Sequence, residues 1–479
     1  MTEIGFMRPG GEVTTLLDLT NRDAQENDLF PLDTNTTWFT RNQNRRNIPF
    51  VPVVQDFSFR GPASYGQRFT FDIGSLPCGD LIYGAVLQVK LSHWFDLTTL
   101  TNITSGAYTY DDPSHTWFFA NSLGSALIEK AELEIDGVTI EEIDGDFSFV
   151  FSSLFSELNT QFGVANDGLG YVSIPDLLNW NVKRNFPIED GNIFCLLPFF
   201  FMRTRLKESI AMVAIKEGSA RIHVTFKNFK DLVRQRIGYR ASCDSTPLGT
   251  TVLFNSGAKQ IQVTDTVPDF QSVKLITYGA YLDGLERNKM LREPFEHLFR
   301  EVQTFYFEEP TKYIVSKTSS DSIYIQLPLE ANHPLEEIIW FLRLKDTNLN
   351  NEHTNFSGVL EKDYDPTYNP LKPLLKRAVI QANGITLCDS TEDYYRQLIA
   401  NHHKGGIVSY NKFIYGYPFA NHPSEHQPSG SLNASRLQSL RLSLEVTAPQ
   451  GYQWEVKVFC LGLNWLRYEN GLCNKLFED

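Results

Sequence analysis

The chain of 479 residues lacks a long hydrophobic segment. Its longest uncharged apolar run, Ile193–Met202, has half of the ~20 residues that a membrane-spanning helix needs, and Pro198 interrupts it. The first residues, MTEIGFMRPGGE, contain no apolar core of the kind found in signal peptides. We therefore expect neither a transmembrane helix nor a secretory signal.

Basic residues and paired cysteines are also scarce. The 43 Lys and Arg against 57 Asp and Glu give a net charge of −14. Binding to a nucleic-acid backbone needs cations that displace counterions, so this balance argues against direct nucleic-acid binding. The six cysteines are scattered and contain no CxxC pair, which indicates free thiols in a reducing compartment.

Motifs for catalysis and cofactor binding are absent or incomplete. The stretch Gly61–Gly66 has the spacing of a phosphate-binding loop, but Gln67 stands where that motif requires Lys. Adjacent acids such as Glu336-Glu337 would point to opposite faces of a strand and so would not converge on one substrate. Four histidines offer metal ligands without a Cys pair or carboxylate cluster beside them: His402, His403, His422 and His426. We expect no enzyme, cofactor or metal site.

Aromatic residues and alternating segments are what the chain does have. Aromatics reach 13% of the residues, a level that strand-rich cores favour. Apolar and polar side chains alternate in several segments: 130–135, 222–227, 325–329, 440–446 and 454–460. A period of two is typical of half-buried strands, and long amphipathic patterns are few. The fold class is therefore all-β, with antiparallel sheets packed as sandwiches or barrels.

An internal repeat divides the chain. Residues 127–147 align with residues 374–394 at an offset of 247, so that Asp136-Gly137 matches Asn383-Gly384. Asp-Gly and Asn-Gly favour type I′ hairpins, because both central positions need positive φ. In both copies a short helical pattern follows, and Asp146-Phe147 matches Asp393-Tyr394. In the second copy Ser390 and Asp393 have the spacing of a capping box, and a helical face is predicted from Tyr394, Tyr395, Leu398 and Ile399. A second match, 81–92 with 335–346 at an offset of 254, supports one duplicated β-domain.

We accordingly divide the chain into an arm, two β-domains, a linker and a tail. The predicted ranges are 1–50 for the N-terminal arm, 51–232 for the first domain, 233–262 for the linker, 263–470 for the second domain and 471–479 for the C-terminal tail. Two long connections, 98–115 and 346–373, are expected at the outer tips of the domains, because long loops are usually functional or mobile.

One segment carries a family resemblance. The sequence EHQPSGSLNASR resembles a signature of the major capsid proteins of nucleocytoplasmic large DNA viruses. The matching residues are Glu425, His426, Gln427, Pro428, Ser429, Gly430, Asn433, Ser435 and Arg436. The junction at 37–50 is similar to the family through Trp38, Phe39, Arg45 and Arg46, although Ile48-Pro49 departs from its pattern. The run at 196–226 also resembles that family.

The resemblance implies a double jelly roll, that is, two tandem eight-stranded antiparallel sandwiches with short helices and long loops. It implies a structural protein that forms homotrimeric, pseudo-hexameric capsomers, which tile the icosahedral shell of a virion. The implied partners are further copies of the chain, minor capsid or cement proteins, penton proteins and, indirectly, an inner viral membrane. Assembly would take place in the host cytoplasm. In this reading Ser429 and Gly430 form a turn, Pro428 fixes the entry to it, and Asn433 and Ser435 satisfy backbone groups of the loop.

Two other functions fit a β-sandwich chain. A carbohydrate-binding protein would need aromatic or acidic residues that converge on one face, and no spacing in this sequence shows such a group. A minor virion protein with a single jelly roll, such as a penton, would not need the internal duplication.

Overall fold

The computed structural model describes most of the chain, in sixteen segments. These are residues 49–59, 63–74, 78–91, 100–102, 106–107, 115–154, 192–203, 208–216, 219–237, 251–254, 261–263, 269–310, 322–364, 367–402, 412–423 and 427–477. Of the sequence motif at 37–50, the residues Trp38, Phe39, Arg45 and Arg46 lie outside the described part, as do Glu425 and His426.

Eight strands form the first half of the molecule. They are β1 (Phe50–Ser58), β2 (Arg68–Asp72), β3 (Leu81–Lys90), β7 (Ile128–Ile135), β8 (Val138–Ile143), β9 (Asn192–Leu196), β10 (Ala220–Phe226) and β14 (Ser272–Leu282). They pair as two antiparallel sheets, in the orders β1-β14-β3-β9 and β2-β10-β7-β8. The alternation read from the sequence has its cause here, because one side of each strand faces the space between the sheets.

Eight further strands form the second half. They are β15 (Phe295–Glu308), β16 (Ile323–Leu329), β17 (Pro334–Leu344), β18 (Leu375–Ala382), β19 (Ile385–Thr391), β20 (Ile414–Pro418), β22 (Leu440–Val446) and β23 (Trp454–Glu469). Their sheets have the orders β15-β23-β17-β20 and β16-β22-β18-β19. Two short strands extend the first of these sheets: β21 (Leu432–Asn433) pairs with β17, and β24 (Leu472–Lys475) pairs with β23.

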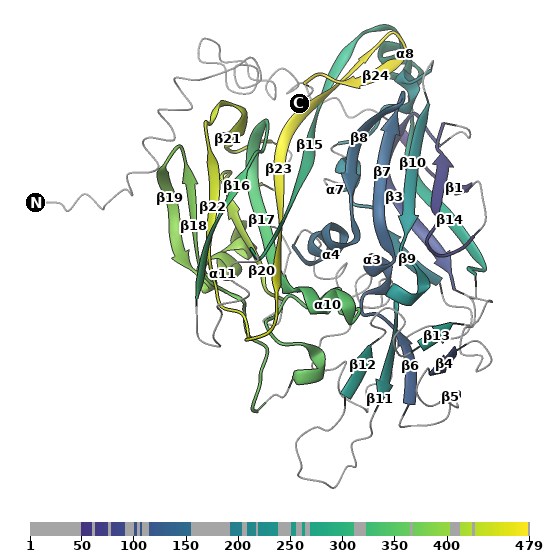
Figure 1. Cartoon of the computed structure of the whole chain (residues 1–479). Helices are drawn as coiled ribbons and strands as arrows, with labels where there is room; N and C mark the ends of the chain where they lie inside the picture. Colours follow the sequence, from purple (N-terminus) through teal and green to yellow (C-terminus); the bar gives the residue numbers. More distant parts are fainter. Residues whose placement is uncertain are drawn as a thin grey trace, which may run out of the picture.

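The two halves follow the same path. If the eight strands of each half are numbered in chain order, one sheet reads 1-8-3-6 and the other reads 2-7-4-5 in both halves. This order places the first and last strands side by side and is that of a jelly roll. The predicted double jelly roll is therefore confirmed, and Figure 1 shows the four sheets as successive layers with small helices between the two rolls.

The repeated hairpin is also confirmed. Asp136 and Gly137 have φ of 53° and 83°, and Asn383 and Gly384 have φ of 49° and 81°. Both hairpins carry a register shift at the same place, between Leu133/Glu134 and between Ile380/Gln381. The predicted helices follow as α4 (Gly145–Leu154) and α11 (Glu392–His402). The duplication thus preserves the turn, the bulge and the helix that follows.

Inserted segments of the first roll build two small sheets at one end of the molecule (Figure 1). One has the order β12-β11-β6 and the other β13-β4-β5. Their bounds are β4 (Leu100–Asn102), β5 (Gly106–Ala107), β6 (His115–Phe119), β11 (Val233–Ile237), β12 (Thr251–Phe254) and β13 (Ile261–Val263). The segment predicted as a polar linker therefore contains β11, β12 and most of β13. Of these strands, β13 pairs with β4 of the long loop, β11 pairs with β6 at the end of that loop, and β12 pairs with β11.

Two positions differ from the sequence-based expectation. Strand β14 lies between β1 and β3, so it belongs to the first roll, although the sequence placed residues 263–470 in the second domain. A jelly roll needs its eighth strand beside its first, and we propose Asp283 as the division between the rolls. The expectation for loop 346–373 is wrong in part, because residues 351–361 are buried rather than displayed at a tip.

The remaining helices of the described residues are short. They are α3 (Leu123–Ala126), α7 (Phe200–Arg203), α8 (Gly284–Arg292) and α10 (Lys345–Leu349), with 3-10 turns at Met212–Ala214, Phe229–Asp231, Glu361–Asp363 and Ala434–Arg436. Within the described residues no helix has the length and apolar character needed to cross a bilayer. A single cluster of buried apolar side chains runs through both rolls, so their cores are continuous.

Candidate functional site: the contact between the two jelly rolls

Helix α4 of the first roll contacts the second roll through ion pairs and aromatic packing. The helix begins after Asp144, whose Oδ1 accepts a hydrogen bond of 2.8 Å from the Phe147 N–H. A side chain that caps the first turn in this way satisfies a backbone donor that has no partner inside the helix. The cap fixes the start of α4 beside the sheet β15-β23-β17-β20, and so it positions the two residues that follow, Asp146 and Phe147.

Asp146 joins the two rolls through two ion pairs. Its Oδ1 lies 3.0 Å from Arg343 Nη1 on β17, and its Oδ2 lies 2.8 Å from Lys457 Nζ on β23. Lys457 also pairs with Asp144, and Arg343 also pairs with Glu455. Burial by itself raises the pKa of Asp146, but Arg343 and Lys457 outweigh burial and hold that pKa well below its ordinary value. The carboxylate therefore stays charged wherever the protein is folded at ordinary pH.

Aromatic packing surrounds these charges. The ring of Phe147 is fully buried and lies 5.1 Å from the ring of Phe459 on β23. Phe149 contacts Phe356 at 5.7 Å, and Phe356 stacks on Phe341 of β17 at 4.0 Å. These rings come from helix α4, from the buried loop 351–361 and from the outward face of the second roll's sheet. Edge-to-face and stacked pairs of this kind add a preferred geometry to the area that they bury.

A second ionic group lies farther along the same contact. Arg300 on β15 donates to Glu336 of its own roll, Nε to Oε2 at 2.6 Å, and pairs with Glu208 of the first roll. Arg203 on α7 pairs with Glu141 at 2.6 Å and donates to the Arg300 carbonyl. All of these carboxylates are buried.

The pKa values of these carboxyl groups rise. Burial raises the pKa of Glu336 to about 7, against the opposing pull of Arg300. Burial likewise raises the pKa of Glu208 and of Glu141. Two carboxyls share the single Arg300 guanidinium, so one of them retains a proton more easily than an exposed acid would.

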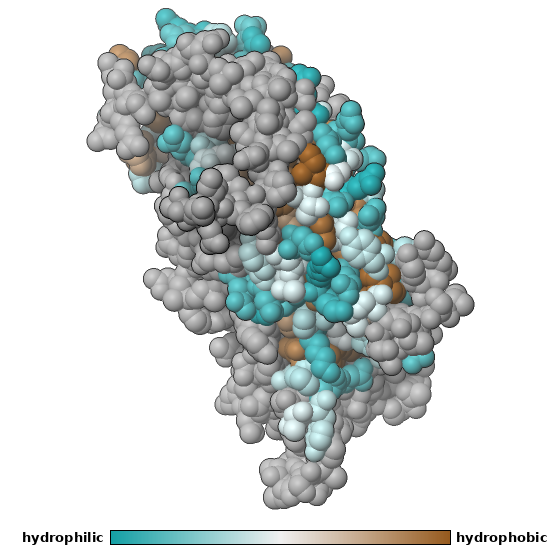
Figure 2. All heavy atoms as spheres, turned by 90° about the vertical axis from the view of Figure 1, so that its left-hand side faces the viewer, coloured by the Kyte–Doolittle hydropathy of each residue, from teal (hydrophilic) through white to brown (hydrophobic). Residues whose placement is uncertain are grey.

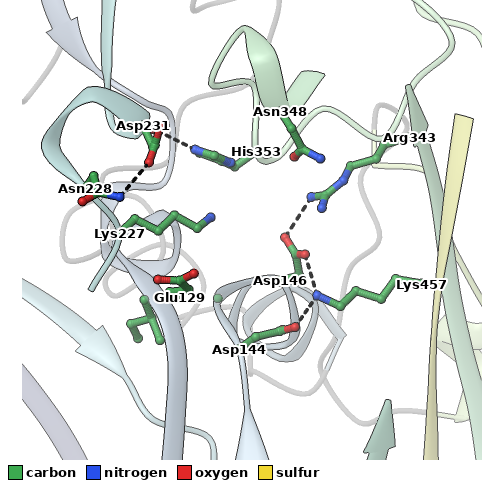
Figure 3. A pocket seen from close by; sticks show the side chains of 12 residues that line it. Glu129, Asp144, Asp146, Lys227, Asn228, Asp231, Arg343, Asn348, His353 and Lys457 are labelled. Atoms are coloured by element: carbon green, nitrogen blue, oxygen red, sulfur yellow. Dashed lines mark hydrogen bonds and ion pairs between the residues drawn. The ribbon is translucent and has the colours of Figure 1, made fainter. Parts of the chain in front are cut away.

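A cavity of about 390 Å³ opens beside Asp146. Figure 3 shows the side chains of Lys227 and His353 in it, opposite Arg343 and Lys457. The His353 ring lies 2.8 Å from the Asp231 carbonyl, and burial lowers its pKa to about 3, so it is neutral. Burial also lowers the pKa of Lys227. At this cavity Asp146 pairs with Arg343 and Lys457 of the second roll, which is the arrangement of a structural contact between domains rather than of two carboxylates poised on a substrate.

Most of the resemblance-based residues fall in one loop before β22. Gly430 has φ of 143°, and a Cβ there would lie 3.0 Å from the Phe419 carbonyl. The Ser429 hydroxyl accepts a bond of 2.8 Å from the His422 N–H, and the Ser435 hydroxyl accepts one of 2.8 Å from the His333 N–H. Asn433 is buried in β21, whereas Gln427 and Arg436 are exposed. Pro428 precedes this turn.

The residues predicted as a structural motif belong to different elements that lie far apart in the sequence. Asp136, Gly137, Asn383 and Gly384 form the two hairpin turns. The candidate metal ligand His422 is exposed, His402 ends α11, and His403 and His426 lie outside the described residues. Within the described part no three His, Cys, Asp or Glu side chains form a group that could hold a metal ion.

Three of the residues that join the rolls have no distinctive pattern in the sequence. Arg343, Lys457 and Arg300 look like ordinary charges on alternating strands. A usable signal was the repeat itself, since Asp146-Phe147 matches Asp393-Tyr394 and acidic-aromatic pairs at the start of a repeated helix suggest a repeated contact.

Comparisons with known proteins cover nearly the whole chain. The protein-family model described as "Major capsid protein N-terminus" matches residues 37–281. The protein-family model described as "Large eukaryotic DNA virus major capsid protein" matches residues 286–472. The two matches meet close to Asp283. A major capsid protein of Pyramimonas orientalis virus is 24% identical over 459 residues, which cover 89% of this chain and 90% of that protein.

Solved structures show the same fold. A quasi-atomic model of the PBCV-1 virus capsid matches with a TM-score of 0.64 and 18% identity, covering 91% of this chain and 98% of that one. The Faustovirus major capsid protein matches with a TM-score of 0.62 and 13% identity, covering 96% and 98%.

Proposed function

The chain belongs to the family of large eukaryotic DNA virus major capsid proteins, and from this premise we propose that it assembles as a homotrimer whose six jelly rolls form one pseudo-hexameric capsomer. The chain itself is a structural capsid protein of the virion and not an enzyme. What we propose is the way in which copies of this chain assemble.

The observation that carries the proposal is the identical strand order of the two rolls within one chain. Three chains with two similar rolls each supply six similar units around one axis. Closed cyclic symmetry limits the assembly to a defined ring, and six similar units can tile a near-hexagonal lattice. The buried ion pairs at Asp146 and Arg300 support this further, because they hold the two rolls of a chain in one relative position.

We also propose the finer partners that the family resemblance implies. Trimers would contact one another in the shell, and minor capsid, cement and penton proteins would join them. An inner viral membrane would be an indirect neighbour. The net charge of −14 supports a shell without direct nucleic-acid contact, because it supplies no excess of cations. Assembly would take place in the host cytoplasm.

The molar mass in solution tests the trimer. Light scattering on the purified protein at neutral pH is expected to give a stable species of three times 54.7 kDa. Negative-stain images of that species should show a ring with near-sixfold outline. A species that remains at 54.7 kDa at high protein concentration would contradict the proposal.

A further inference from the structure

The duplication allows each contact between the rolls to be compared with its equivalent elsewhere in the chain. On the helix that makes the contact, the offset of 247 aligns Asp146 with Asp393 and Phe147 with Tyr394. The same offset aligns the first residue of α4 with the first residue of α11. Asp393 and Tyr394 are therefore the residues that would make the same contact from the second roll.

The strand side of the contact can be matched in the same way. An isolated bridge joins Ile82 to Ile210 in the first roll, and β17 pairs Leu335 with Leu432 in the second. The offset between Ile82 and Leu335 is 335 − 82 = 253. In both strands a bulge follows at the next residue, so this offset keeps the inward and outward faces of the two strands aligned. The offset of 254 read from the sequence is therefore one residue too long here.

With this offset Gln88 of β3 matches Phe341 of β17. Lys274 of β14 lies opposite Gln88, and Lys457 of β23 lies opposite Phe341. Lys274 is thus the equivalent of Lys457, the lysine that pairs with Asp146. The same strand pairing identifies the equivalents of the residues that lie beside Lys457 on the outward face of β23. These equivalents lie on the outer face of the first roll's sheet β1-β14-β3-β9.

The equivalent positions differ in whether another roll covers them. The positions within the chain's own contact are covered: Asp146 (13% side-chain exposure), Phe147 (0%), Lys457 (15%), Leu461 (2%) and Val302 (7%). Their equivalents are open: Asp393 (69% side-chain exposure), Tyr394 (40%), Lys274 (52%), Tyr278 (37%) and Val54 (59%). Both halves of a second, similar contact are therefore present and uncovered.

We propose that helix α11 of one copy docks on the outer face of β1-β14-β3 of the next copy, with Asp393 against Lys274 and Tyr394 against the apolar residues beside it. The occupant is a second copy of this chain, and the inference rests on the proposed trimer. The two surfaces lie on different rolls, so the contact is head-to-tail, and a head-to-tail contact closes into a ring when its rotation permits.

Charge and apolar character are complementary on the two surfaces. Asp393 is acidic beside an exposed tyrosine, and Lys274 is basic among Val54, Tyr278 and the half-buried Ile276. Each has one long ion pair within its own roll, Asp393 with Arg396 at 3.6 Å and Lys274 with Asp56 at 3.8 Å, and both side chains stay exposed. Figure 2 shows the molecule from the side of the second roll, where hydrophobic residues lie among hydrophilic ones. Exposed aromatic and apolar side chains at a charged rim are typical of protein–protein contacts.

The capsid signature loop takes a place in the same contact. Leu432 matches Ile210, so the loop at 427–436 is equivalent to the segment around Glu208 and Ala211. In the first roll that segment contacts the second roll, through the Glu208–Arg300 pair and a 3.4 Å bond from Ala211 N–H to the Tyr468 hydroxyl. The exposed Gln427 and Arg436 are therefore expected at the edge of the contact between copies.

A charge reversal tests the pairing. Lys274→Glu and Asp393→Lys, made separately, each place like charges opposite one another, and each is expected to weaken the trimer by about ten-fold or more, as for charged pairs at other interfaces. The double variant K274E/D393K restores opposite charges and should recover most of the loss. Sedimentation equilibrium of the full chain measures the dissociation constant, and thermal unfolding of each variant shows that the monomer fold is unchanged.

Lys376→Glu is the matched control. Lys376 is also an exposed lysine with one carboxylate partner, and its equivalent, Glu129, stays exposed in the contact within the chain. This variant should form trimers like the original protein. A trimeric original protein whose single variants K274E and D393K also remain fully trimeric would overturn this inference and leave the proposed trimer intact. An original protein that is monomeric would overturn both.

Discussion

Single residues decide how firmly the two rolls are joined, and Asp146 is the clearest case. Its side chain is only 13% exposed, and its two cationic partners come from two strands of the other roll. Removing one member of such a group leaves buried charges without compensation, which is more costly than the attraction of an exposed pair.

We predict that Asp146→Asn lowers the free energy of unfolding by about 3–5 kcal/mol, because Arg343 and Lys457 lose a shared carboxylate. The measurement is urea unfolding at pH 7. Asp393→Asn is the control at the equivalent exposed position, and in the dissociated monomer it should change stability by less than about 0.5 kcal/mol. Equal losses in both variants would contradict the role given to Asp146.

Acid should weaken the same contact. The pKa of Asp146 is depressed in the folded state, so its contribution is present above its ordinary value of 3.8 and is lost as the pH falls below that value. Asp146→Asn should therefore show a smaller loss of stability than the original protein when the pH is lowered through this range, measured by the urea midpoint.

Glu336 should act in the opposite direction. Its pKa is raised from 4.5 to about 7, so the folded state holds this proton more tightly than the unfolded state. The resulting stability is present below pH 4.5 and is lost as the pH rises toward 7. Glu336→Gln should reduce the change in melting temperature between pH 4.5 and about 7, whereas Glu142→Gln, at an exposed position, should leave that change as it is. A profile unchanged by Glu336→Gln would refute this assignment.

At the scale of elements, turns and loops set the register of the strands. Gly384 and Gly430 both have positive φ, but their surroundings differ. Nothing lies within 4 Å of a Cβ built on Gly384, whereas a Cβ on Gly430 meets the Phe419 carbonyl at 3.0 Å. The hairpin glycine is therefore needed for its backbone conformation, and the glycine of the capsid signature is needed for space as well.

We predict that Gly384→Ala costs about 1–2 kcal/mol, the strain of a left-handed conformation. Gly430→Ala should cost more, because the chain must also move away from Phe419. Chemical unfolding of the two variants under the same conditions gives the comparison. A smaller effect at Gly430 would show that the loop before β22 adjusts freely.

The predicted capping box in the second repeat is wrong at this scale. The sequence suggested Ser390 as the residue before the helix, but Ser390 lies in β19 and α11 begins at Glu392. Of the predicted helical face, Tyr395 is buried and bonds to the Ala378 carbonyl, while Tyr394 is exposed. Periodicity identified the helix, but it could not show which of two adjacent tyrosines faces inward.

At the scale of the whole molecule, the two rolls share one core. The cluster of buried apolar residues extends from the first roll's sheets through α4 to Phe459 and the second roll's sheets. A shared core couples the folding of its parts, whereas separate domains unfold separately.

We therefore predict a single calorimetric unfolding transition for the chain, and in Asp146→Asn a broadened or divided one. Differential scanning calorimetry at low protein concentration keeps trimer dissociation out of the measurement. Two well-separated transitions in the original protein would show that the rolls fold independently.

The N-terminal arm offers a second prediction at this scale. Residues 1–50 contain the pair Trp38-Phe39 outside both predicted domains, and an aromatic pair on a polar arm suggests docking on a neighbouring copy. A chain without residues 1–48, which keeps all of β1, should fold with an unchanged melting temperature for the monomer and form trimers or lattices less readily. Unchanged assembly in light scattering would assign the arm no part in it.

The sequence by itself determined the class of the fold, the duplication, the two hairpin turns and the family. These follow from local rules: a period of two marks strands, Asp-Gly and Asn-Gly fix tight turns, and a repeated pattern marks a repeated unit. The boundary between the rolls did not follow, because β14 is next to the second roll in the chain and joins the first roll only through its ladders with β1 and β3.

Only the tertiary structure decided which charges matter. Asp146 and Asp393 are equivalent in sequence, yet Asp146 is largely covered by the other roll and pairs with Arg343, while Asp393 is exposed. That difference arises from which surface lies opposite, and a pairing between residues 197 or 311 positions apart has no local signature in the chain. The repeat fixed where such contacts could form, and the packing of one roll on the other determined which of them this chain makes with itself.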